Sequence, residues 1–359
     1  MAPDLERLIS IKPTGDDRGK THASAQHAAR WGGNEALRGK LLGSGPIMKK
    51  IDLLVSEICW MVAQQTVVTV AFDTFNMLRP VFHGDFIRLE GRALSINKSS
   101  IVCQVSVYRH DFASDAFQLT HNAVVTFVAI GGGGGALPEL FDPQKPVACE
   151  KLRALAQARK ELSAQWRKQQ DEVAAMGTIA HAMIPSLPGK VHAARVLDIQ
   201  STILETRNNF LPKHANQNGN VFGGVLLDWM CARNFTKNYS MVTVGMNRVH
   251  FKLPINLDNL VSIRARIEIV VYRVELPDNI QALSHTGCFE VLNLEEDNQR
   301  RREIHLGVTA KESDQDGMQA LLKAYRRHLF ERQDAELLGM APIPLSVSRK
   351  FLDAPAPRL

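Results

Sequence analysis

The stretch that decides the fold reads His214-Ala215-Asn216-Gln217-Asn218-Gly219-Asn220-Val221-Phe222-Gly223-Gly224-Val225-Leu226-Leu227. A polar loop passes here into an apolar segment through a pair of glycines. Two glycines let the backbone approach a ligand closely, and the N-terminus of a following helix offers unpaired N–H donors. Such donors polarise a carbonyl that becomes an oxyanion. The alternative is that Gly223 and Gly224 only permit tight packing of the helix on a sheet.

An internal repeat surrounds this stretch. Val67 to Phe72 aligns with Met241 to Met246, and Leu78 to Pro80 aligns with Lys252 to Pro254, both with an offset of 174 residues. A repeat of this length indicates two copies of one folding unit.

Each copy predicts a helix followed by an antiparallel meander. The glycine-led segments 45–54 and 223–230 are apolar almost all round, which is typical of a helix buried against a sheet. Downstream, β-branched and partly alternating residues predict strands over 88–96, 100–108, 123–130, 260–271, 282–292 and 304–310. The predicted fold class is therefore α+β, with two tandem units.

The connecting segments set the expected domain boundaries. Gly131 to Gly135 is a flexible exit from the last strand of the first unit, and Glu150 to Val173 is a charged amphipathic helix. The glycine run is no phosphate loop, because neither Lys-Ser nor Lys-Thr follows it. We expect an N-terminal extension (1–40), a first domain (41–135), a charged helical linker (136–195), a second domain (196–315) and a C-terminal helix and tail (316–359).

Composition fits a folded protein with a small-molecule ligand. Hydrophobic residues make up 45% and charged residues 22% of the 359 residues, which is close to the globular average. The net charge of +6 is modest and suits a nucleotide-bearing molecule. No zinc-finger spacing, RNA-recognition motif or basic arm is present, so nucleic acid is not an expected partner.

The cysteines and the chain ends bear on the compartment. Five scattered cysteines without a CxxC pair indicate free thiols in a reducing compartment. No apolar run approaches the roughly 20 residues that cross a bilayer, and no secretory signal opens the chain. Acidic residues among the first 40 are unusual in a transit peptide, and the Pro-Arg-Leu end is only distantly similar to a peroxisomal signal. We expect a protein of the mitochondrial matrix or cytoplasm that is not secreted.

The loop and helix quoted first resemble the active site of hot-dog acyl-CoA thioesterases, in which an Asn lies six residues before the aromatic or His that precedes a Gly-Gly pair. Asn216 holds that place relative to Phe222. The resemblance covers about residues 40–130 and 195–312 and is closest to the double hot-dog, mitochondrial type. It implies two tandem hot-dog domains, each a long central helix wrapped by an antiparallel sheet, and an activity that uses no metal or other cofactor.

In that family an acidic residue seven positions after the Gly-Gly pair acts as general base or nucleophile. The second half has Cys231 there, whereas counting seven from Gly45 in the first half reaches Asp52. A rival register that starts at Gly39 also ends on Asp52. Asp228 lies three residues before Cys231, roughly 60° around the helix, so we expect it to cap the helix or face solvent.

The two halves are complementary. The first half has Leu37 where the second has Asn216, and Asn34 replaces it only with a gap in the alignment. Because hot-dog sites form between two folds, the resemblance implies one composite site that pairs Asp52 with Asn216. Its implied reaction is hydrolysis of an acyl-CoA to free fatty acid and CoA, with the carbonyl held near Gly224.

Further residues are assigned to substrate binding or to lesser roles. Gly223, Gly224 and Phe222 are expected at the substrate, and Arg248 and Lys252, with Arg264 as a further candidate, at the CoA phosphates. His214 and His250 are alternatives as bases. Cys231 is disfavoured as a nucleophile because an apolar helix raises the pKa of a thiol.

The same fold serves two rival functions. Dehydratases of the same fold carry a Gly-Asp-x-Asn-Pro motif, and Gly84-Asp85-Phe86-Ile87 lacks its Asn-Pro. The stronger alternative is a catalytically silent double hot-dog that binds acyl-CoA or serves as an assembly module. In either case acyl-CoA is the expected partner, and the fused pair is expected to form a homo-oligomer.

Overall fold

The computed structural model describes residues 8–10, 24–30, 37, 39–131, 137, 146–184, 195–266, 268–295, 300–339 and 343. Most of the predicted N-terminal extension, the glycines after Gly131 and the C-terminal tail lie outside the described residues. In the described part, no helix combines the length and hydrophobicity needed to cross a membrane.

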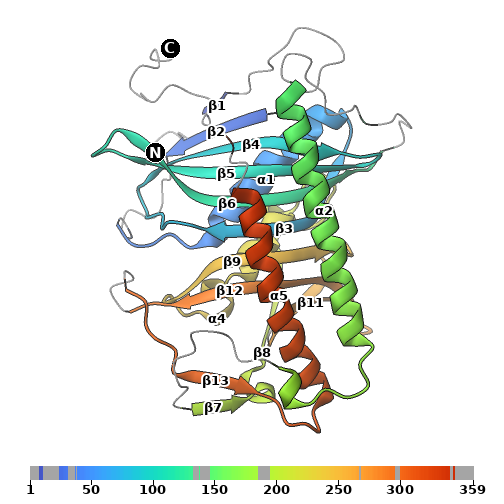
Figure 1. Ribbon diagram of the computed structural model, residues 1–359. Coiled ribbons are helices and arrows are strands. Elements are labelled where there is room, and N and C mark those ends of the chain that lie inside the picture. The colour runs from blue at the N-terminus through green and yellow to red at the C-terminus, as the bar shows by residue number, and fades with distance from the viewer. Residues whose placement is uncertain are drawn as a thin grey trace.

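One large antiparallel sheet contains most of the strands, in the order β1-β2-β4-β5-β6-β3-β9-β12-β11-β10-β8 (Figure 1). The first half contributes β1 (Leu8–Ser10), β2 (Ser24–Arg30), β3 (Val67–Met77), β4 (Phe86–Ile96), β5 (Ser100–Asp111) and β6 (Ala116–Ala129). The second half contributes β8 (Leu204–Asn209), β9 (Met241–Phe251), β10 (Leu260–Ala265), β11 (Ile269–Glu275) and β12 (Ile280–Asn293). Strands β7 (Arg195–Asp198) and β13 (Leu306–Thr309) form a separate parallel pair.

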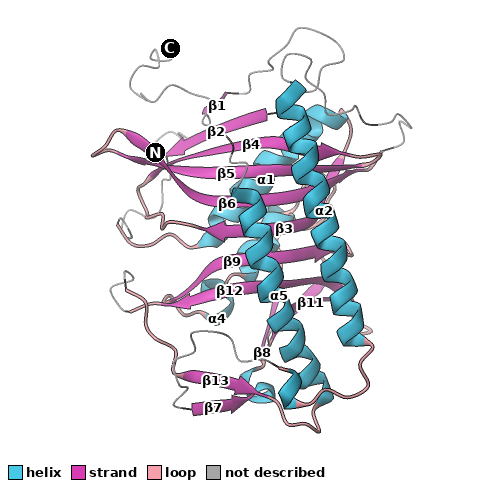
Figure 2. Ribbon diagram, in the orientation of Figure 1, coloured by secondary structure: helices cyan, strands magenta, loops and turns pink. Residues whose placement is uncertain are grey.

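The two repeated segments join the halves. They form β3 and β9, which pair antiparallel with Ala71 opposite His250 and Phe75 opposite Met246. The internal repeat therefore becomes two similar units that share one continuous sheet, as Figure 2 shows.

Helix α1 (Ser44–Ala63) is the central helix of the first unit and lies behind the sheet in the view of Figure 1. One face of the helix carries fully buried apolar side chains, which include Ile47, Met48, Ile51, Val55 and Ile58. Burial of each such side chain stabilises the fold by roughly 1.5–3 kcal/mol. This confirms the prediction that the segment 45–54 is a buried helix.

The central helix of the second unit is broken, unlike the single long helix expected. It consists of α3 (Gly223–Met230) and α4 (Ala232–Thr236), and Cys231 between them has an extended ψ of 144°. Thr243 Oγ1 accepts a hydrogen bond from Ala232 N at 3.0 Å, and Asn234 Nδ2 donates to the Asp228 carbonyl at 2.7 Å. These bonds satisfy backbone groups that the break leaves without a helical partner.

The strand predictions hold in the first half and need one correction in the second. Strands β4 and β5 contain the predicted segments 88–96 and 100–108, and β6 contains the predicted segment 123–130 up to Ala129. The single strand predicted over 260–271 is wrong, because the chain turns after Ala265 and returns as β11. The segment alternates between apolar and polar residues along most of its length, and such a pattern does not reveal where a hairpin reverses.

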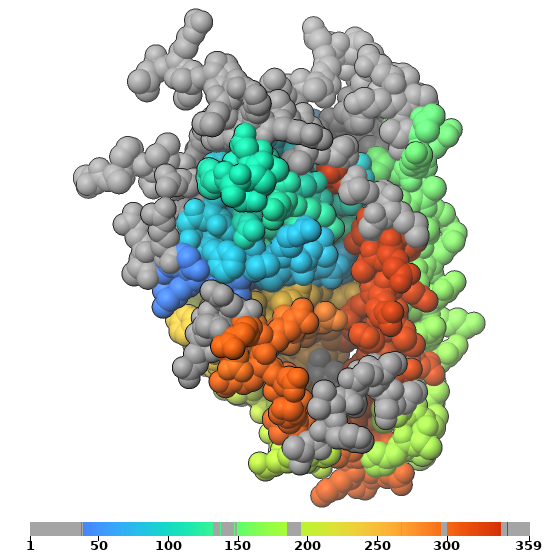
Figure 3. Space-filling model, turned by 60° about the vertical axis from the view of Figure 1, so that its left-hand side comes forward, coloured from blue at the N-terminus to red at the C-terminus, as the bar shows by residue number. Residues whose placement is uncertain are grey.

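Two long helices cover the face of the sheet opposite α1. Helix α2 (Pro146–Ala174) contains the charged amphipathic segment predicted between the halves, and α5 (Gln315–Gly339) lies beside it (Figures 1 and 3). Arg159 of α2 and Asp334 of α5 form a buried two-point ion pair, with N···O distances of 2.8 and 3.0 Å. The remaining helical turns are 3-10 segments at His181–Met183, Ile199–Thr202 and Pro212–His214.

Candidate active site

The candidate site centres on Asp52, which faces the start of α3. Asp52 lies on the buried side of α1 with 0% of its surface exposed. Its Oδ2 accepts a hydrogen bond from the backbone N–H of Gly224 at 2.8 Å, and its Oδ1 accepts one from Thr69 Oγ1 at 2.9 Å. A carboxylate of the first half is thus held by the helix N-terminus of the second half.

The glycine pair makes this approach possible. A Cβ on Gly224 would lie 2.9 Å from the Cα of Lys49 on α1, closer than real Cβ contacts come. A Cβ on Gly223 would lie 3.2 Å from Oδ2 of Asp52 and 3.4 Å from the ring of Phe251. The glycines therefore serve both roles considered from the sequence: they allow tight packing, and they bring a free N–H to a charged group.

The environment of Asp52 tunes it toward neutral pH. Burial raises the pKa of its carboxyl to about 7, and the hydrogen bonds from Thr69 and Gly224 oppose part of that rise. An ionised carboxylate accepts about four hydrogen bonds, and these two donors leave capacity for a water molecule. A base whose pKa lies near the working pH is suited to general base catalysis.

Asn216 lies in the loop that leads into α3. The loop is tied to the helix start by a hydrogen bond from Phe222 N to the His214 carbonyl at 2.9 Å. The Asn216 amide donates to Asn220 Oδ1 at 2.6 Å, and its Oδ1 accepts from Asn218 N at 2.9 Å. Among the described residues the side chain of Asn216 therefore bonds within its own loop, and no hydrogen bond joins it to Asp52.

Phe222 and His214 frame the entrance to α3. Phe222 is the residue before the helix, half-buried, and its ring lies against Gly224. Nδ1 of His214 accepts a hydrogen bond from Leu211 N at 3.0 Å, which orients the imidazole within the loop.

Thr69 was not among the site residues predicted from the sequence. It lies on β3 in the repeat, and its equivalent at the offset of 174 is Thr243 on β9. Both hydroxyls bond to the central helix of their own unit, Thr69 to Asp52 and Thr243 to Ala232. The presence of a threonine at the same position of both copies was the sequence feature that could have identified Thr69.

At the start of α1, a carboxylate of the second unit faces a glycine of the first, but the contacts differ from those of Asp52. The carboxylate of Asp228 on α3 lies directly against Gly45 at the start of α1, in the space that a side chain there would fill. Asp228 is half-buried and accepts a hydrogen bond from Asn234 Nδ2 at 2.8 Å, so the expectation that it caps the helix or faces solvent is wrong. Burial, and then the charge of Asp228, raise the pKa of the Cys231 thiol.

Arg248 and Lys252 were expected at the CoA phosphates, and that assignment stays a prediction; the structure gives their present surroundings. The Arg248 guanidinium stacks on Trp166 at 4.7 Å and on Phe330 at 4.8 Å, between α2 and α5, and donates to Ser163. Lys252 is exposed just after the end of β9, and its charge lowers the pKa of His250 less than burial does. Phe251 lies against Gly223, whereas Arg248 points into the layer of α2 and α5. Arg248 has a left-handed φ of 50° where the pairing of β9 with β12 shifts register, so the side chains do not simply alternate here.

Arg264 and His250 have partners other than Asp52. Arg264 is exposed and pairs with Glu205 at 3.0 Å. Burial lowers the pKa of His250, which interacts electrostatically with Asp73, Arg248, Lys252 and Arg167 rather than with Asp52.

Comparison with known proteins agrees with this architecture. Residues 44–112, which contain α1 and strands β3 to β5, match the Thioesterase superfamily. Over 93 residues the chain is 32% identical to an uncharacterized acyl-CoA thioester hydrolase of Haemophilus influenzae, a match that covers 25% of this chain and 60% of that relative.

Two solved structures are similar in fold. An acyl-CoA hydrolase from Staphylococcus aureus in complex with coenzyme A is 18% identical, with a TM-score of 0.38, and is matched over 45% of this chain and 100% of its own. A putative oleoyl thioesterase from Lactobacillus plantarum is 11% identical, with a TM-score of 0.43, over 77% of this chain and 98% of its own. The predicted fold class is confirmed: the chain has the α+β hot-dog fold, and residues 44–112 match the Thioesterase superfamily.

Proposed function

We propose that this protein hydrolyses acyl-CoA thioesters to free fatty acid and CoA at one composite site between its two halves. The observation that carries the proposal is the Asp52 carboxylate, which is held by Thr69 of the first half and by the α3 N-terminus of the second. The named activity of the Haemophilus influenzae relative supports the same reaction. We assign the chain to the double hot-dog type because the repeat supplies both folds.

Asp52 supplies the base. In its ionised form it removes a proton from a water molecule, whose oxygen bonds to the thioester carbonyl carbon. The tetrahedral intermediate collapses as the C–S bond breaks, and the CoA thiolate leaves and takes up a proton. The other route consistent with the geometry is direct attack by the carboxylate, which forms an anhydride that water then hydrolyses.

The carbonyl oxygen needs a donor other than Gly224. The Gly224 N–H already donates to Asp52, and the Val225 N–H donates to the Phe222 carbonyl at 3.0 Å. The Gly223 N–H makes no hydrogen bond to the described residues, and Gly223 lies near Asp52, because a Cβ built on it would be 3.2 Å from Oδ2. We therefore assign Gly223 N–H to the thioester oxygen, which changes the role first expected of Gly224.

The loop 211–222 controls the access of the thioester to Asp52 and the position of the Asn216 side chain. Because Asp52 is fully buried, the thioester reaches it only when this loop or the Phe222 ring moves. The same movement frees the Asn216 amide from Asn220, so that it can hold the attacking water or the carbonyl. Phe222 then contacts the acyl chain in this proposal.

The test compares three proteins for CoA release from short-, medium- and long-chain acyl-CoAs, using thiol detection. Asp52→Asn should lose at least about a hundredfold of kcat/KM, the contribution typical of a general base. Asp228→Asn is the matched control, because it alters the carboxylate at the opposite helix start and should keep most activity. If Asp228→Asn abolishes turnover and Asp52→Asn does not, the site assignment is wrong.

The silent-binder alternative has its own outcome. If the wild-type protein releases no CoA from any chain length while calorimetry shows that it binds acyl-CoA, the protein is a binding module. Activity in wild type that Asp52→Asn removes excludes that alternative.

A further inference from the structure

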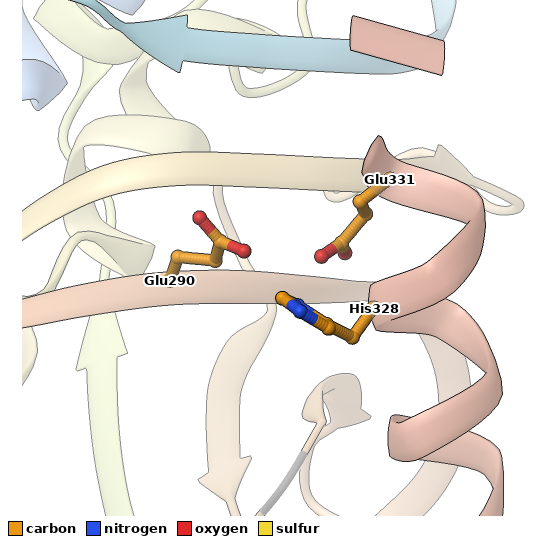
Figure 4. Close-up of side chains that lie close together, drawn as sticks. All are labelled: Glu290, His328 and Glu331. Carbon is orange, nitrogen blue, oxygen red and sulfur yellow. The ribbon is translucent and has the colours of Figure 1, made fainter. Parts of the chain in front are cut away.

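A second cluster of chemically active side chains lies on the face of the sheet opposite Asp52. Glu290 projects from β12, and His328 and Glu331 project toward it from one turn of α5 (Figure 4). Their nearest ligand atoms, two carboxylate oxygens and one imidazole nitrogen, all lie within 4.8 Å of one another. We propose that these three residues, with the side-chain oxygen Oδ1 of Asn247, form a site for a divalent transition-metal cation. This proposal is independent of the proposed thioesterase activity.

The sheet register builds the floor of this site. Asn76 of β3 lies opposite Gly245 of β9, and Gly245 lies opposite Glu290 of β12, so the three form one row across neighbouring strands. Residues in such a row project to the same face. A Cβ on Gly245 would lie 2.8 Å from Oε2 of Glu290, so the glycine leaves the space that the carboxylate occupies.

Asn247 gives an independent indication of a ligand. Its side chain is only 5% exposed, and its Oδ1 has no hydrogen-bond partner among the described residues. Such an orphaned oxygen costs about 1–3 kcal/mol. It lines a small cavity of about 10 Å³ together with Asn76, Glu290 and Glu331. That space suits one small ion or one water molecule.

The donor set matches a transition metal. Carboxylate oxygens and imidazole nitrogens bind zinc at about 2.0–2.2 Å, and a four-coordinate site leaves room for the amide oxygen or water. Two facing carboxylates repel each other unless a cation or proton lies between them. The helical spacing of His328 and Glu331 places both ligands on one face of α5. A bound ion would therefore fasten α5 to β12.

The experiment uses the full chain after treatment with a chelator and exchange into metal-free buffer. Titration with Zn²⁺, followed by calorimetry and by thermal unfolding, should show one ion per chain and a rise in Tm. Co²⁺ substitution should give a nitrogen- and oxygen-ligand spectrum without thiolate charge transfer. A thiolate signature would overturn the site, because it would place the ion on cysteine.

The variants His328→Gln and Glu290→Gln should weaken binding by more than the roughly 10–100-fold caused by losing an outer partner of a metal ligand. His305→Gln is the matched control, because His305 pairs with Glu303 at 3.5 Å on the exposed surface. Equal Tm values of the metal-free proteins establish that the variants fold. If all three variants bind Zn²⁺ as wild type does, or if wild type binds none, the cluster is a proton-sharing or water-filled contact and the proposal fails.

Discussion

Gly224 donates its backbone N–H to Oδ2 of Asp52 at 2.8 Å, across 172 residues of sequence. This bond connects the two halves at the candidate catalytic carboxylate. It also means that any change to the approach of α1 and α3 alters the environment of that carboxylate.

The pH dependence of the reaction should report Asp52. Its pKa is raised to about 7 by burial, and only the ionised form acts as a base or nucleophile. We expect kcat/KM to fall about tenfold for each pH unit below that value and to level off above it. Measuring kcat/KM from pH 5 to 9 checks this. A profile that is flat down to about pH 5 would contradict a role for a carboxyl with this pKa.

The same carboxyl should make stability depend on pH. Because the pKa of Asp52 is raised above its unfolded value of 3.8, its contribution to stability is full below that pH and is lost as pH rises to about 7. The loss is on the order of 4 kcal/mol. Asn does not ionise, so Asp52→Asn should gain stability relative to wild type between about pH 4 and 8. Urea unfolding at both pH values tests the sign.

Thr69 should set the pKa of Asp52. Its hydroxyl stabilises the ionised carboxylate, so Thr69→Val should raise that pKa and shift the pH–rate profile to higher pH. Thr69→Ser keeps the hydroxyl and should restore the wild-type profile. A change in rate without a shift of the profile would indicate that Thr69 acts only through packing.

Gly224→Ala should disrupt the contact between the central helices. The new Cβ would lie 2.9 Å from the Lys49 Cα, and backbone cannot give way as a flexible side chain can. Overpacking of this kind typically costs about 1–3 kcal/mol. Gly177→Ala is the control, because no atom lies within 4 Å of its Cβ. Chemical denaturation of both variants checks the prediction, and equal stabilities would contradict it.

The stability of the layer formed by α2 and α5 should depend on its buried ion pair. Asp334→Ala leaves the Arg159 guanidinium buried without its partner, and we expect a loss of about 3–5 kcal/mol. Glu295→Ala breaks the solvent-exposed pair with Arg302 and should cost less than about 1 kcal/mol. Thermal unfolding of the two variants measures the difference, and similar losses would show that burial does not matter here.

The sequence by itself determined the features that depend on local pattern. Asp52 was implied by the resemblance to hot-dog thioesterases, counted seven residues from Gly45. The repeat at offset 174 and the two glycine-led apolar segments predicted two similar units. Helical and strand periodicity carry this information because a buried face must recur with the period of its element. For the same reason the amphipathic segment between the units was predicted as a helix.

Only the tertiary structure decided which distant groups meet. The bond from Gly224 to Asp52, the placement of Asp228 against Gly45 and the convergence of Glu290 on α5 all depend on how whole elements pack. Arg248 is the clearest example. Its charge and position in the sequence suggested a phosphate ligand, but they could not reveal that its guanidinium stacks between Trp166 and Phe330. Periodicity specifies which face of an element is buried, but the partner on the other side is chosen by the packing of the complete sheet and its helices.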